Sequence, residues 1–276
     1  MMVICPVCPH HCHLEEGQTG RCRVRRNVGG KTVDGNWGKV TALALDPIEK
    51  KPLRCFYPGS RILSVGSYGC NLDCPFCQNA GIAAVGEGAV ETVELSPEAL
   101  ADMAEQARPQ GNIGVAFTYN EPLVGWEYVA ATSRLVHDRG MKTVAVTNGC
   151  VTGAAAREVL PHLDALNIDL KVFAAEGYRR LGGDLDTVQT FIRLAVEAGC
   201  HVELTTLVVP GLNDDEGLMA EEAAWIAGID PEIPLHVTRF FPAHRMARAE
   251  PTPVSTVYHL ADTAAQSLNT VYVGNC

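Results

Sequence analysis

Three cysteines fall within eight residues of the stretch SYGCNLDCPFCQNAG, which spans residues 67–81. Cys70, Cys74 and Cys77 are spaced C-x3-C-x2-C, and thiolate sulfur is a ligand for zinc and for iron–sulfur clusters. A structural zinc site takes four protein ligands, and an electron-carrying cluster usually takes four cysteines. The loop therefore predicts either a zinc site that takes its fourth ligand from elsewhere in the chain, or a [4Fe-4S] cluster whose fourth iron is left open.

A second set of cysteines lies at the N-terminus, where Cys5, Cys8, Cys12 and Cys22 alternate with three histidines. Four thiolates can close a tetrahedral zinc site or bind a second iron–sulfur cluster, and the residues leave both open. The first 60 residues contain only short apolar runs, and a module of that size needs a staple of this kind. The sequence therefore predicts a metal centre here, either Zn²⁺ or a second Fe–S cluster.

Charge and composition exclude several classes of protein. The net charge is −10, whereas a general nucleic-acid binder shows a basic face. No apolar stretch is long enough to span a bilayer, and the start MMVICPVCPHHC lacks the regions of a secretory signal. We therefore expect a cytoplasmic protein with no membrane or nucleic-acid partner. Cytoplasmic thiols stay reduced, so the 11 cysteines indicate metal binding rather than disulfides.

From residue 61 onward, apolar strands alternate with amphipathic helices, a pattern typical of parallel βα units. We predict an α/β fold with a partial (βα)6 barrel over residues 61–276, preceded by a Cys-rich module over residues 1–60. The module is expected to contain a hairpin at NVGGKTVDG, where Gly-Gly permits the turn. The expected barrel strands are 61–69, 112–120, 142–149, 164–171, 201–211 and 234–244, with a further short strand at 270–274.

The unusual polar motifs all lie where these strands end. In βα barrels the chemistry sits at the carboxyl ends of the strands. The cysteine triplet follows the first strand, and the motifs TYNEP, TNG, DLK, PGLND and RFFPAH follow or end the next five. A structural barrel would scatter such residues, so their convergence predicts an active-site mouth.

The spacing C-x3-C-x2-C with an aromatic residue, Phe76, before the last cysteine resembles the radical S-adenosylmethionine (SAM) superfamily. The barrel resembles the activating enzymes of glycyl radical enzymes. The strings DPIEKKPL, PGSRILSVGSYGCNLDCPFCQN and TYNEP more closely resemble the radical enzyme of the AMMECR1/Memo/radical-SAM set. The resemblance implies a [4Fe-4S] cluster on the three cysteines and SAM on the open iron. Reductive cleavage of SAM then yields a 5′-deoxyadenosyl radical that abstracts hydrogen from a substrate.

The resemblance also assigns cofactor contacts. Glu121 stands where relatives carry Gly-Gly-Glu-Pro, with Tyr119 and Asn120 replacing the glycines, and is expected to accept a charge-assisted hydrogen bond from the methionine ammonium. Asp169 and Lys171 match the D-x-K pair of the activating enzymes, and strand alternation puts both on one face, toward the lumen. A plain buried ion pair is the alternative. The full cofactor-binding set is Phe76, Gln78, Asn120, Glu121, Asn148, Asp169, Lys171 and His244.

The resemblance further implies a low-potential flavodoxin or ferredoxin as electron donor. A glycyl radical enzyme, or Memo-like and AMMECR1-like proteins, are the other expected partners. Two rival functions stay open: an iron–sulfur electron carrier or redox sensor, and a zinc-organised binding module. The carrier would need a fourth cysteine close by and has no use for Glu121, Asp169 and Lys171 on one rim. The substrate does not follow from these residues.

Overall fold

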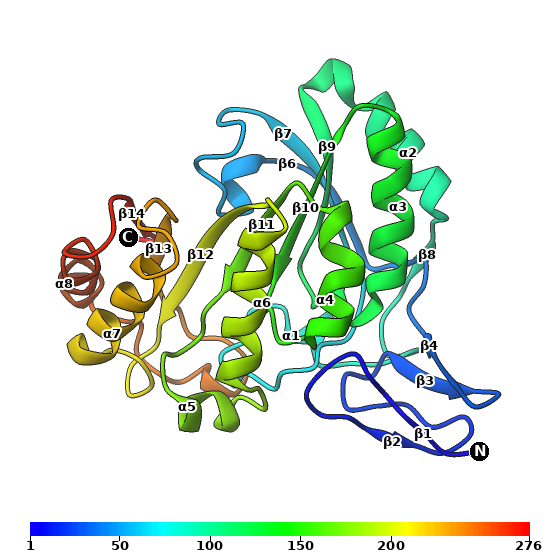
Figure 1. Ribbon diagram of the computed structural model, residues 1–276, viewed down its shortest axis with the longest axis horizontal. Coiled ribbons are helices and arrows are strands. Elements are labelled where there is room, and N and C mark those ends of the chain that lie inside the picture. The colour runs from blue at the N-terminus through cyan, green and yellow to red at the C-terminus, as the bar shows by residue number, and fades with distance from the viewer.

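The chain is built around one curved sheet of eight strands (Figure 1). The computed structural model describes residues 1–276. The strands follow the spatial order β14-β13-β12-β11-β10-β9-β7-β6. Their bounds are β6 (Ala42–Pro47), β7 (Arg61–Gly66), β9 (Asn112–Phe117), β10 (Lys142–Thr147), β11 (Ala165–Asp169), β12 (His201–Val208), β13 (Leu235–Arg239) and β14 (Val271–Gly274).

Seven of these strands are parallel, and β6 pairs antiparallel with β7 at one edge. The predicted α/β fold and partial barrel are therefore confirmed, including the seventh parallel strand near the C-terminus. The two edge strands, β6 and β14, do not pair with each other. The barrel thus stays open along one side.

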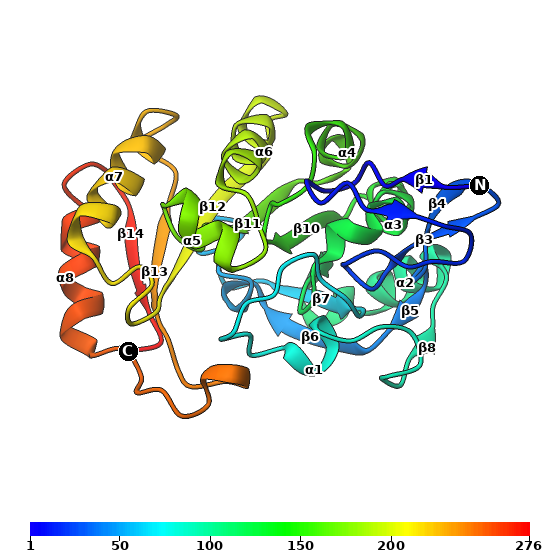
Figure 2. The ribbon, with the colours of Figure 1, turned by 90° about the horizontal axis from the view of Figure 1, so that it is seen from below.

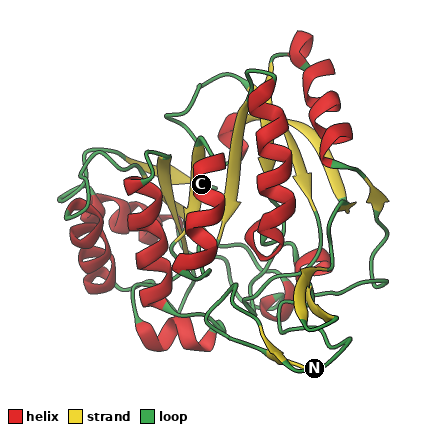
Figure 3. Ribbon diagram, turned by 45° about the vertical axis from the view of Figure 1, so that its right-hand side comes forward, coloured by secondary structure: helices red, strands yellow, loops and turns green.

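Helices cover the outer face of this sheet (Figures 2 and 3). Figure 2 shows α4, α6, α7 and α8 as an arc around the outside of the curved strands. None of the helices is long and apolar enough to cross a membrane. The helix bounds are α1 (Ala80–Ala83), α2 (Pro97–Gln106), α3 (Trp126–Asp138), α4 (Gly153–Val159), α5 (Ala175–Arg180), α6 (Leu185–Glu197), α7 (Glu216–Ala227) and α8 (Val254–Ala264).

Local sequence explains why these elements form. In α6, Val188, Phe191, Ile192 and Ala195 are fully buried, and their spacing places them on one helical face against the sheet. In β11 almost every residue is buried, as expected for a parallel strand covered on both faces. Ser96 caps α2 as predicted, because its hydroxyl accepts a hydrogen bond from the Ala99 N–H.

The N-terminal segment is made of short strand pairs. β1 (Val3–Ile4) pairs with β2 (His13–Leu14), and β5 (Lys39–Val40) pairs with β8 (Val93–Glu94). The predicted hairpin is confirmed: β3 (Arg25–Val28) and β4 (Lys31–Asp34) are joined by two glycines with positive φ. Because β6 belongs to the main sheet, the sheet of the barrel begins before residue 61. The division of the chain at residue 60 stays a prediction.

The close packing of β9 against β10 at Gly114 can be tested by mutation. A Cβ atom at Gly114 would lie 1.7 Å from the carbonyl oxygen of Lys142. We expect Gly114→Ala to lower the free energy of unfolding by about 1–3 kcal/mol or more, because the strands must separate. Gly81→Ala in α1 is the matched control, since no atom lies within 4 Å of its added methyl group. Denaturant unfolding that finds the two variants equally stable would contradict this packing.

Candidate active site

A cavity of about 570 Å³ opens at the carboxyl ends of the central strands. Its lining includes all three cysteines of the segment 70–77, called the cysteine loop below, which follows β7. The ends of β10 and β11, and the loop after β9, contribute the facing side chains. The structure thus brings most of the predicted site residues together. Those that line the cavity are Cys70, Cys74, Cys77, Phe76, Gln78, Asn120, Glu121, Asn148, Asp169 and Lys171.

Contacts with several other segments hold the cysteine loop in place. The Arg245 guanidinium contacts the Asp73 carboxylate at 3.1 Å, and the N–H of Arg245 donates to the carbonyl of Pro75. Phe76 is buried within the loop. A Cβ at Gly69 would lie 2.4 Å from a methyl group of Val24, and its φ of +87° is one that glycine adopts without strain. The loop therefore needs glycine at this position to pass the N-terminal segment.

The three cysteine sulfurs belong to half-buried side chains, and two donors approach one of them. The N–H of Leu72 and the side-chain amide of Asn148 point at Cys70 Sγ, at 3.4 and 3.5 Å. Burial raises the pKa of Cys70 well above its usual range and that of Cys74 to about 11. The thiols are thus protonated without a metal. Since metal ligation deprotonates cysteine, these three sulfurs fit a cluster bound at the loop.

Glu121 is the most enclosed charged group of the site. Its side chain accepts hydrogen bonds from the Thr147 hydroxyl at 2.6 Å, the Asn148 N–H at 2.7 Å and the Leu123 N–H at 3.0 Å. Burial raises its pKa to about 7, against the opposing effect of these hydrogen bonds. Oε2 accepts only the Asn148 N–H, so it retains capacity for a further donor from the cavity. The Glu121 carboxylate can therefore bind a cationic group there.

Asp169 and Lys171 form an ion pair, with 2.6 Å between the Lys171 ammonium and the carboxylate. Both line the cavity, which confirms the expected common face. Burial lowers the pKa of Lys171, but the ion pair with Asp169 acts in the opposite direction, and the pKa lies above its usual value. The pair thus presents a fixed positive and a fixed negative group beside the cysteine loop.

Three residues of the predicted cofactor-binding set are not placed inside the cavity with a side chain available to a ligand. The side chain of Asn120 hydrogen-bonds to the backbone: it accepts from the Ser67 N–H and donates to the carbonyls of Tyr68 and Gly69. Gln78 is exposed at the cavity mouth. His244 is exposed in a 3-10 turn and is not among the cavity-lining residues. The cofactor roles of these residues, like those of the other site residues, stay predictions.

Sequence reasoning missed the way Tyr119 is held. It adopts φ +73°, the left-handed conformation that the replaced glycine would take without strain. Its hydroxyl donates to Asp46 at 2.8 Å, and the Lys51 ammonium lies 4.7 Å above its ring. A Cβ at Gly66 would lie 2.8 Å from that ring. Tyr119 therefore forms part of the cavity wall, where Asp46 and Lys51 of the string DPIEKKPL hold its side chain. That string was the one sequence feature that could have indicated this contact.

Asn71 is a second residue that the motif did not reveal. It is fully buried beside Cys70. Its side-chain amide donates to the carbonyl of Cys150 at 2.6 Å, and its oxygen accepts from the Asn148 side chain at 2.9 Å. Asn71 thereby connects the cysteine loop to the segment after β10. Its type alone gives no signal for this role, because the partner is distant in sequence.

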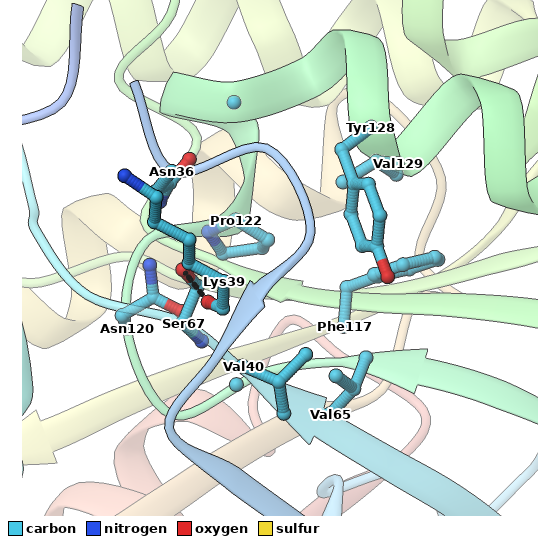
Figure 4. Close-up of a pocket in the computed structure, with 12 residues that line it drawn as sticks. Asn36, Lys39, Val40, Val65, Ser67, Phe117, Asn120, Pro122, Tyr128 and Val129 are labelled. Atoms are coloured by element: carbon cyan, nitrogen blue, oxygen red, sulfur yellow. Dashed lines mark hydrogen bonds between the residues drawn. The ribbon is translucent and has the colours of Figure 1, made fainter. Parts of the chain in front are cut away.

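A much smaller cavity lies behind Asn120 and is separate from the cysteines (Figure 4). Its volume of about 30 Å³ accommodates roughly one water molecule. Val40, Val65, Phe117 and Tyr128 form its apolar wall. It carries no cluster of reactive groups, so the chemistry belongs to the larger cavity.

This chain is similar in sequence and in fold to known proteins. Residues 64–223 match the radical SAM superfamily. An uncharacterized protein of Methanocaldococcus jannaschii is 35% identical over 276 residues, which cover 99% of this chain and 81% of that protein. Among solved structures, a domain of a pyruvate-formate lyase-activating enzyme from Bacteroides vulgatus has a TM-score of 0.51 at 18% identity, covering 58% of this chain and 98% of that domain.

SuiB of Streptococcus suis, solved bound to S-adenosylmethionine, has a TM-score of 0.53 at 13% identity. The match covers 77% of this chain and 48% of SuiB, so this chain spans about half the length of that protein. At such identities the solved structures show the fold alone. The family match covers more than half of the chain and includes the cysteine loop. The chain therefore belongs to the radical SAM superfamily, whose enzymes bind a [4Fe-4S] cluster and S-adenosylmethionine.

Proposed function

We propose that this chain binds a [4Fe-4S] cluster on the cysteine loop and cleaves SAM in the cavity beside it. One observation carries the proposal: the three thiols share a single cavity with the Glu121 carboxylate and with the pair of Asp169 and Lys171. An electron carrier needs no such set of charged groups next to its cluster. A substrate-binding enzyme needs them, because a zwitterionic cofactor must be held in one orientation.

We assign each part of SAM to a different side chain of the cavity. Glu121 Oε2 would accept a hydrogen bond from the methionine ammonium, and Lys171 would face the methionine carboxylate. Asp169 would accept from the ribose hydroxyls, and Phe76 would pack beside the adenine. Bound there, the cluster and SAM together supply a 5′-deoxyadenosyl radical that abstracts a hydrogen atom.

The substrate is expected in the part of the cavity away from the cysteine loop. That part is lined by Tyr119, Arg54 and His236 and lies along the open side of the barrel. His236 is already engaged, since its Nε2 lies 2.6 Å from the buried Glu203 carboxylate. The Arg54 guanidinium stacks over the Tyr272 ring at 5.0 Å. Arg54, which is exposed and whose guanidinium forms no ion pair, is therefore the side chain best placed to meet the substrate.

Radical SAM enzymes typically take electrons from flavodoxin or ferredoxin, and we propose a low-potential protein of this kind as donor. Memo-like and AMMECR1-like proteins are the proposed partners, supported by the strings DPIEKKPL and TYNEP. Activation of a glycyl radical enzyme is the alternative, supported by the fold shared with the activating-enzyme domain. A glycine-centred radical signal, after incubation of a glycyl radical enzyme with this protein, SAM and a reductant, would favour the alternative.

The proposal predicts SAM cleavage that depends on the cysteine loop. Anaerobically reconstituted protein with SAM and dithionite should form 5′-deoxyadenosine, measured by chromatography. Cys74→Ala should reduce the product to the level without enzyme, because one iron loses its ligand. Cys200→Ala is the matched control, since this half-buried thiol contacts the carbonyls of Leu160 and Leu163 instead of the cavity.

Either of two results would contradict the proposal. One is equal product from the Cys74 variant and the wild type. The other is a reconstituted wild-type protein that neither cleaves SAM nor binds it by calorimetry, which would favour an electron carrier.

Glu121→Gln tests the assigned ammonium contact. Hydrogen bonds to charged groups contribute about 1.5–3 kcal/mol, so SAM affinity should fall roughly 10- to 150-fold, measured by anaerobic calorimetry. Glu222→Gln is the control, because this carboxyl is also fully buried but contacts Thr206 and does not line the cavity. An unchanged dissociation constant for Glu121→Gln would remove Glu121 from the ammonium contact.

A further inference from the structure

The four N-terminal cysteines lie on neighbouring loops within residues 5–22. Cys5, Cys8 and Cys22 are buried, and Cys12 is half-buried. The N–H of Cys5 donates to the carbonyl of Cys12 at 2.9 Å, which closes the first loop. The two-residue strands β1 and β2 are the only regular structure that holds this loop. So little secondary structure cannot by itself fix four buried thiols.

Backbone N–H groups point at two of the four sulfurs. The N–H of Arg21 lies 3.5 Å from Cys12 Sγ, and that of Arg25 lies 3.3 Å from Cys22 Sγ. A thiol is only a weak acceptor, whereas a thiolate is a strong one. Cys12 and Cys22 therefore lie where backbone donors would stabilise a thiolate.

Four thiolates in one small space require a positive centre. Arg25 is the cation beside Cys5, but its guanidinium already contacts the Glu127 carboxylate at 2.6 Å. A paired arginine does not neutralise four further negative charges. A metal ion or cluster bonded to the sulfurs supplies that charge directly.

We propose that Cys5, Cys8, Cys12 and Cys22 together bind one metal centre through four thiolates, either Zn²⁺ or an iron–sulfur cluster. No three Cys, His, Asp or Glu side chains lie close enough to hold one ion in this structure, which applies equally to the cysteine loop. Binding a single Zn²⁺ therefore requires the N-terminal loops to close inward. A cluster bonds its four thiolates at separate irons and spans a wider set of sulfurs.

This centre lies against the wall of the active site. Thr152 donates its N–H to the Val7 carbonyl and its hydroxyl to the Pro6 carbonyl, at 2.9 and 2.7 Å. His10 Nε2 donates to the carbonyl of Asn71 at 2.9 Å. Asn71 is the buried neighbour of Cys70. The metal centre thus fixes the segment against which the cysteine loop is packed.

The test isolates the N-terminal centre from the proposed cluster. A variant with Cys70, Cys74 and Cys77 all changed to Ala loses the ligands of the proposed cluster and retains the N-terminal set. Purified and reconstituted anaerobically, it should hold about one Zn²⁺ per chain, or about four irons with matching sulfide, by elemental and sulfide analysis. Adding Cys8→Ser and Cys22→Ser should abolish this content, and adding Cys200→Ser should preserve it. Zinc or cluster each supports the proposal and identifies the metal.

Less than about a tenth of a metal equivalent in the triple-Ala variant, after reconstitution with zinc and with iron and sulfide in turn, would overturn the proposal. So would metal that persists without Cys8 and Cys22. Because those serine variants can fail to fold, alkylation of the triple-Ala variant gives a second readout. The four N-terminal thiols should resist iodoacetamide until a chelator is added, by peptide mass spectrometry. Equal labelling with and without the chelator would also overturn the proposal.

Discussion

The site depends on one buried carboxylate, Glu121, and on the donors that converge on it. Glu121 follows β9, and its carboxylate accepts from the hydroxyl of Thr147 and the N–H of Asn148 at the end of β10. Asn148 in turn reaches Cys70 and Asn71 with its side chain. A single charge thereby links two strand ends to the cysteine loop. Leaving such a group without donors in the interior would cost several kcal/mol, so the three segments are constrained together.

The same network explains why the cavity is charged yet ordered. Glu121 and the pair of Asp169 and Lys171 occupy strand ends, where the parallel sheet directs side chains to one rim. Their orientations come from backbone donors and from each other, so they are set before any ligand arrives. Preorganised charges of this kind lose little energy to reorganisation when a zwitterion binds. The open side between β6 and β14 leaves the rest of the lumen to the substrate.

Much of this arrangement could be predicted because it is local in sequence. The spacing of apolar residues predicted the strands, and a cap residue predicted the start of α2. The alternation of side chains along a strand predicted that Asp169 and Lys171 share one face. The rest depends on tertiary contacts that no local pattern encodes. The Tyr119 hydroxyl meets Asp46, 73 residues away, and Asn71 meets Cys150, 79 residues away. The pairing of β6 with β7 is also a tertiary choice, since KVTALAL is too short to reveal its partner.

The central claim is that the cysteine loop leaves one iron open for SAM. Electron paramagnetic resonance of the dithionite-reduced protein tests this most directly, in a variant with Cys5, Cys8, Cys12 and Cys22 all changed to Ser. Only the cluster of the cysteine loop then contributes to the spectrum. The account predicts a reduced-cluster signal whose g-values shift when SAM is added, because a ligand has reached the iron. A cluster signal that is identical with and without saturating SAM would contradict it.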